Sequence, residues 1–84
     1  MLYLGWDESQ SIDAGAEGPW AELTVLRPGL VLIDSPATRS EVYHGFKHHL
    51  PPETGVLVAP LADAPKWSRL APGTGTWLRE RSAR

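Results

Sequence analysis

The sequence predicts a small α+β domain built on a four-stranded mixed sheet. An apolar run at residues 30–33 is followed by a helical pattern that ends near Leu50, and a second apolar run occupies residues 56–59. Two such runs joined by a helix are typical of parallel strands connected by a right-handed crossover. Residues 30–61 are therefore interpreted as a βαβ unit, which we expect to share its sheet with an antiparallel hairpin.

The residues before this unit predict two strands separated by a loop. Residues 2–6 form a short apolar strand, and residues 7–19 form an acidic loop, or a poorly formed helix around residues 11–17. Residues 20–26 alternate apolar and polar side chains, as half-buried strands do. Pro28 and Gly29 are typical of a tight turn, so this strand should form a hairpin with residues 30–33. Residues 30–33 are all apolar, without alternation with polar residues. This strand should therefore lie in the centre of the sheet, with both of its faces covered.

The main helix has a clear start in the sequence. Thr38 and Glu41 are spaced as in a capping box, and Ser35 before Pro36 is the alternative cap. The apolar stripe that should pack on the sheet consists of Val42, Phe46 and Leu50.

A helical segment at residues 63–81 is expected to follow the last strand, residues 56–61. It should contain a short helix to about residue 70, a break at residues 72–75 and a last turn at residues 76–81. We expect both helices on one face of the sheet, which leaves the other face available to a partner or a ligand.

Composition restricts the class of protein. The 84 residues suffice for one domain, residues 1–84, with a thin core. The chain has no cysteine, and its net charge of −2 argues against general nucleic-acid binding. The first residues resemble neither a signal peptide nor a membrane span. Two lysines against six arginines, and no asparagine, indicate a GC-rich genome, so we expect a bacterial, cytoplasmic protein.

One helix face carries a candidate divalent metal site. Glu41, His44 and His48 are spaced three and four residues apart, which places them within about 60° of one another on the face opposite the apolar stripe. A histidine pair at this spacing with a carboxylate one turn earlier can supply three metal ligands. The fourth ligand is not evident, and a solvated polar face explains the same pattern. Apart from this possible metal, no cofactor is expected.

A second candidate site lies where the central strand ends. Asp34, Ser35 and Thr38 fall between this strand and the helix N-terminus, a position at which α/β sheets bind ligands and backbone amides bind small anions. Ordinary helix capping is the alternative. No Gly-x-Ser-x-Gly elbow accompanies Ser35, so no catalytic residue is predicted.

Tryptophan is abundant for so short a chain. Large amphipathic side chains anchor protein interfaces, although a small core needs bulky residues too. Arginines near the last two tryptophans create an aromatic and cationic pattern that also occurs in single-stranded nucleic-acid binding. The candidate partner-binding residues are Trp6, Trp20, Trp67, Trp77, Arg69 and Arg79.

These observations favour a non-catalytic protein–protein interaction module that forms a homodimer or binds another protein. The first alternative is a small metal- or ligand-binding protein or enzyme that uses the glutamate–histidine face. The second alternative is single-stranded nucleic-acid binding through the C-terminal tryptophans and arginines. No membrane association is expected.

Overall fold

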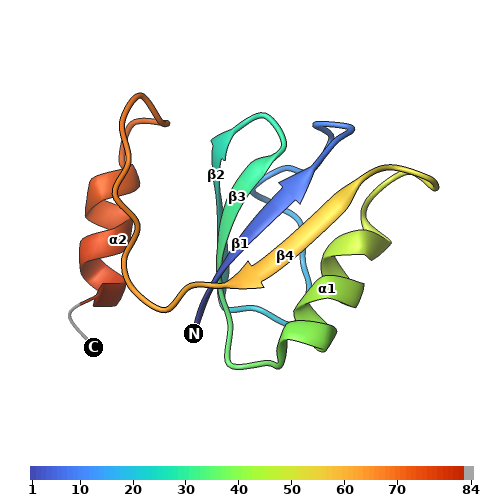
Figure 1. Cartoon of the computed structure of the whole chain (residues 1–84), viewed down its shortest axis with the longest axis horizontal. Coiled ribbons are helices and arrows are strands. Elements are labelled where there is room, and N and C mark those ends of the chain that lie inside the picture. Colours follow the sequence, from blue (N-terminus) through green and yellow to red (C-terminus); the bar gives the residue numbers. More distant parts are fainter. Residues whose placement is uncertain (83–84) are drawn as a thin grey trace.

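The computed structural model describes residues 1–82 and confirms a small α+β fold (Figure 1). Four strands form one sheet and two helices pack against it. In chain order the elements are β1 (Leu2–Asp7), β2 (Glu22–Arg27), β3 (Leu30–Asp34), α1 (Arg39–His48), β4 (Val56–Pro60) and α2 (Thr74–Ser82). No helix within the described residues is both long and apolar enough to cross a membrane.

The sheet is antiparallel rather than mixed. The strand order is β2-β3-β1-β4, and each neighbouring pair runs antiparallel. β3 and β4 are parallel to each other, as expected for a crossover, but β1 lies between them and pairs with both. The predicted βαβ unit is therefore split. A local pattern shows that two strands are joined by a helix, but it does not show that a distant strand will pair between them.

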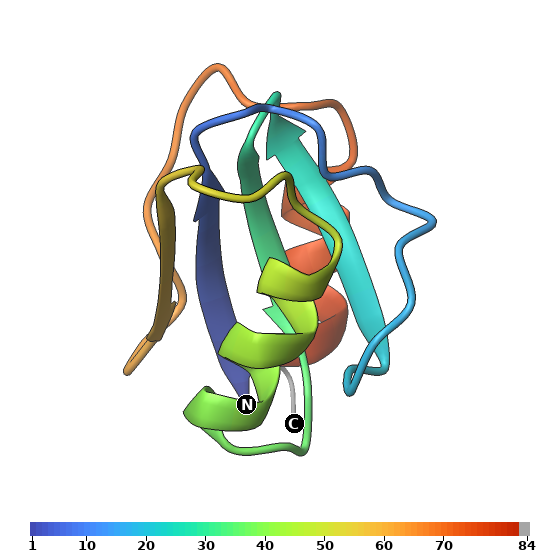
Figure 2. The ribbon, with the colours of Figure 1, turned by 90° about the vertical axis from the view of Figure 1, so that its right-hand side faces the viewer.

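The helices cover opposite faces of the sheet, so the prediction that they share one face is wrong (Figures 1 and 2). Val31 and Ile33 of β3 face α1, and Leu32 between them faces α2. The buried cluster on the α1 face consists of Tyr3, Ile12, Leu23, Val31, Ile33, Val42 and Phe46. The smaller cluster on the α2 face consists of Leu26, Leu32 and Leu78. The continuous apolar segment of β3 is thus buried on both faces of the sheet, as predicted.

The short helix predicted to about residue 70 is absent, whereas the last turn predicted at residues 76–81 lies within α2, which begins at Thr74. Residues 61–73 form no helix or strand, and Arg69 has a φ of 59°, which is incompatible with a continuous α-helix. The helix starts after Gly73, whose φ is 90°. Thr74 begins α2, and its Oγ1 donates a hydrogen bond to the carbonyl of Ala71 over 2.7 Å. The Gly-Thr-Gly segment that was expected to end a helix therefore starts one.

The local predictions around α1 and the hairpin are confirmed. Thr38 and Glu41 form the capping box, with Val42 and Phe46 buried beneath the helix. Gly29 in the β2–β3 turn has a φ of 83°, which favours glycine. A β-bulge between Val25 and Arg27 shifts the register of β2 against β3.

Candidate functional site

The histidine face of α1 is exposed, as predicted, but it does not form a metal cluster. Glu41 accepts hydrogen bonds from the backbone N–H and the Oγ1 of Thr38, at 3.2 and 2.9 Å. These bonds lower the pKa of Glu41, which acts as a helix cap. The ring of His44 lies edge-on to Tyr43, and that of His48 lies edge-on to His49. Across residues 1–82, no three histidine or carboxylate side chains lie close enough to hold a metal ion.

The polar side chains of the second candidate site are engaged within the fold. Asp34 is buried and lies 3.3 Å from Nε of Arg81. The Ser35 hydroxyl donates to the carbonyl of Pro19 and accepts from the Ala37 N–H at 2.9 Å. Thr38 caps α1. These groups hold the chain together at the end of β3, which agrees with the capping alternative.

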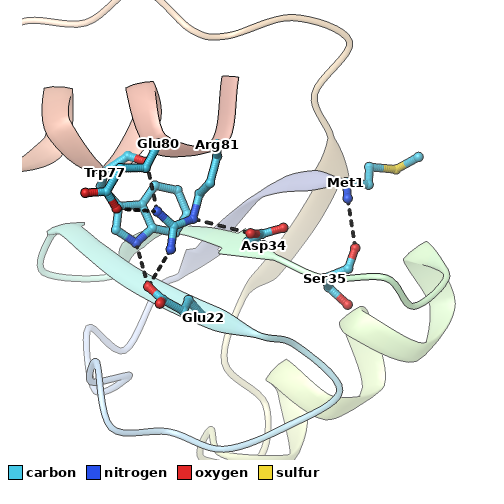
Figure 3. Close-up of polar contacts among 7 residues, drawn as sticks. All are labelled: Met1, Glu22, Asp34, Ser35, Trp77, Glu80 and Arg81. Atoms are coloured by element: carbon cyan, nitrogen blue, oxygen red, sulfur yellow. Dashed lines mark hydrogen bonds and ion pairs between the residues drawn. The ribbon is translucent and has the colours of Figure 1, made fainter. Parts of the chain in front are cut away.

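The structure assembles a polar cluster that the sequence did not predict (Figure 3). Arg81 of α2 is almost fully buried, with its side chain 6% exposed. Its guanidinium stacks on Trp77 at 3.7 Å and donates to the Trp77 carbonyl over 2.9 Å. A second nitrogen lies 2.5 Å from a carboxylate oxygen of Glu22 in β2, and the indole N–H of Trp77 donates to the same oxygen over 3.2 Å. We call Glu22, Asp34, Trp77 and Arg81 the Arg81 cluster.

The Arg81 cluster joins α2 to the sheet rather than forming an open site. Its acidic members come from β2 and β3 and its basic member from α2, so these charges pair within one chain. The spacing of Trp77 and Arg81, four residues apart on one helix, could have indicated a stacked pair. Nothing in the sequence identified the carboxylates, because they lie more than 40 residues away.

The four tryptophans fall into two groups. Trp20 is half-buried and donates its indole N–H to the Ala16 carbonyl over 3.1 Å, and Trp77 belongs to the Arg81 cluster. Trp6 and Trp67 are 42% and 45% exposed. Trp20 packs against the core on the α1 side, whereas Trp67 lies on the α2 side, so the tryptophans are divided between the two faces of the sheet.

Both predicted partner-binding arginines are exposed. Arg69 accepts hydrogen bonds at its carbonyl from the Arg27 guanidinium. Arg79 donates to the hydroxyl of Thr76 over 3.3 Å. Their guanidinium groups are thus available at the surface, but Trp77 lies stacked beneath Arg81 rather than open to a base.

An open apolar surface lies where β1 meets β4. Trp6 and Leu57 are opposite each other in the register of these strands, and they are 42% and 49% exposed. Because Leu2 and Leu4 of β1 pack on the α2 face, the alternation of the strand places Trp6 on that face too. β4 is also an edge strand, with β1 as its neighbour in the sheet. We call Trp6, Leu57 and the free edge of β4 the β4 surface.

Comparison of the chain with protein-family models, with curated proteins and with solved structures yields no match.

Proposed function

We propose that this protein is a non-catalytic interaction module that self-associates through the β4 surface, with a second copy of the chain as the partner. The observation that carries the proposal is the cross-strand pair of Trp6 and Leu57. Two large apolar side chains stand directly opposite each other, each more than 40% exposed, beside a strand edge. Tryptophan in such a position is a frequent energetic anchor of interfaces.

The two edges of the sheet differ in a way that favours pairing at β4. Natural edge strands commonly carry charged residues that prevent another strand from adding to the sheet. β2 has Glu22 and Arg27 at its ends, whereas β4 has the sequence Val-Leu-Val-Ala-Pro and no charge. Pro60 protects only the last position of β4. The unprotected edge is therefore the one beside the exposed apolar pair.

A second copy fits this surface by symmetry. If two β4 strands pair antiparallel about a twofold axis, the unpaired backbone N–H and C=O groups of each strand form hydrogen bonds with those of the other. The two sheets then become one continuous sheet. The apolar pair of each copy then lies next to the junction. We place this module in the bacterial cytoplasm, a setting supported by its cysteine-free and arginine-rich composition.

The test is the mass in solution, measured by light scattering over a range of protein concentrations. We expect the wild-type chain to be a dimer and Leu57→Lys to be a monomer, since lysine places a charge at the edge. Ala21→Lys is the matched control, because it adds the same charge beside β2, the opposite edge, and should remain dimeric. A wild-type chain that stays monomeric at all concentrations, or a dimeric Leu57→Lys variant, would contradict the proposal.

A further inference from the structure

The α2 face of the sheet contains a cavity that the proposed self-association does not use. Its volume is about 240 Å³, and it lies between the sheet, α2 and residues 61–73, which we call the strap. In Figure 1 the strap is the orange trace that runs from the end of β4 to the start of α2. The principal lining side chains are Leu4, Leu32, Leu61, Trp67, Leu70 and Leu78.

The chemistry of the lining defines what can bind. Seven of the eleven lining residues are leucines, and Trp67 and Pro65 of the strap add further apolar surface. Lys66 is the charged side chain among the described lining residues, and it is exposed. Thr74 also contributes to the wall, but its hydroxyl donates to the Ala71 carbonyl. The site thus offers an apolar interior and one cation at its rim.

We propose that this cavity binds a medium-length aliphatic carboxylate, with its chain among the leucines and its carboxylate near Lys66. The volume is suitable, because an apolar protein cavity of about 150 Å³ accommodates benzene, so 240 Å³ accommodates roughly ten carbon atoms. Within the described residues, the buried apolar cluster on the α2 face consists of Leu26, Leu32 and Leu78 alone, so this half of the core is thin around the cavity. An aliphatic occupant completes this half of the core.

The strap is fastened near its two ends and crosses the cavity between them. At one end, the Leu61 N–H donates to the Leu2 carbonyl over 2.9 Å. At the other, the Ala71 N–H donates to the Leu26 carbonyl over 3.0 Å, and the Arg69 carbonyl accepts from Arg27. The middle of the strap carries Lys66 and the exposed ring of Trp67. Entry of an aliphatic chain at the middle of the strap would therefore leave both fastened ends in place.

The test is a titration of the full chain with decanoate, below its micellar concentration, followed by NMR of the leucine methyl groups. We expect saturable shifts at Leu4, Leu32 and Leu78, and no comparable shifts on the α1 face. Decyltrimethylammonium has the same chain with a cationic head, and we expect it to bind at least fivefold more weakly. An absence of saturable leucine shifts, or equal affinity for both amphiphiles, would overturn the proposal.

Two variants separate specific binding from adsorption to any apolar surface. Leu61→Trp fills the cavity and should abolish the shifts while the protein stays folded. Lys66→Gln should weaken decanoate binding severalfold without changing the affinity for 1-decanol, whereas Lys47→Gln on α1 should leave both affinities unchanged. Unaltered decanoate binding in Leu61→Trp would show that the ligand lies outside the cavity and would contradict the proposal.

Discussion

Asp7 at the end of β1 organises the loop that follows it. The residue is fully buried, and its carboxylate accepts hydrogen bonds from the N–H groups of Ser9, Ser11 and Ile12 at 2.8–2.9 Å. These bonds turn the chain so that Ile12 enters the core on the α1 face. One side chain thus gives order to a segment whose polar, glycine-containing sequence indicates only a loop.

Replacing this carboxylate should destabilise the fold. Asp7→Asn keeps the shape of the side chain but places an amide against backbone donors, which leaves buried N–H groups without an acceptor. We expect a loss of about 2 kcal/mol in the free energy of unfolding, measured with urea. Asp13→Asn is the matched control in the same loop: Asp13 is exposed, and its change should cost less than about 0.5 kcal/mol.

The same residue predicts how stability depends on pH. Burial alone would raise the pKa of Asp7, but hydrogen bonds from Ser9, Ile12 and Ser11 outweigh it and hold the pKa below its ordinary value of 3.8. The unfolded chain therefore takes up the proton first as the pH falls. The contribution of Asp7 to stability is complete above the ordinary value and is lost as the pH falls through the lower, folded-state pKa. Urea unfolding from pH 7 to acid should show a smaller loss in Asp7→Asn than in the wild type, and equal losses would contradict this assignment.

At the scale of elements, the attachment of α2 to the sheet depends on one arginine, Arg81. The guanidinium of Arg81 contacts two carboxylates from different strands and stacks on Trp77 within its own helix. Lysine cannot reproduce this planar arrangement. Because few side chains are fully buried beneath α2, the Arg81 cluster should supply much of the attachment of this helix.

Removal of the Arg81 guanidinium should loosen α2 selectively. Arg81→Leu is expected to destabilise the attachment by about 2 kcal/mol, since hydrogen bonds to charged groups are lost. Amide hydrogen exchange should then accelerate more than tenfold in α2 and remain unchanged in α1. Arg79→Leu is the control, because Arg79 lies exposed on the same helix. Equal acceleration in both helices would show that Arg81 supports the whole fold instead.

At the scale of the whole molecule, the two faces of the sheet are unequal. Among the described residues, the α1 face has seven buried apolar core residues, whereas the α2 face has three beside the partly open cavity. In a domain of 84 residues, the larger cluster should determine whether the chain folds at all. The smaller one can open locally without global unfolding.

Truncation of the larger cluster should therefore be severe. Phe46→Ala removes a fully buried ring from α1, and we expect a loss of about 3–5 kcal/mol in the free energy of unfolding. Circular dichroism and urea unfolding give the measurement. Tyr43→Ala, a half-buried aromatic on the same helix, should cost about 1 kcal/mol. If both variants lose the same small amount, α1 does not hold the principal core.

How far the sequence predicts this protein depends on the distance over which each feature is decided. The capping box of Thr38 and Glu41 was predictable because its partners are three residues apart, and the Pro28-Gly29 turn because its backbone geometry requires those residues. The helix expected at residues 63–70 was wrong because Trp67 and Leu70 are apolar for another reason: they line a cavity from an irregular strap. The histidine face was correctly placed on the surface, but spacing along a helix does not supply the further ligands that a metal requires.

The sequence by itself determined the α+β class, the approximate positions of the four strands, the presence of α1 with its apolar stripe and the burial of β3 from both sides. These features follow from backbone preferences and from apolar periodicity within a few residues. Only the tertiary structure decided that β1 lies between β3 and β4, that α2 covers the second face, and that Arg81 meets Glu22 and Asp34. The physical reason is that these contacts join residues far apart in the chain. Their energy depends on which surfaces meet, and no local pattern specifies that choice.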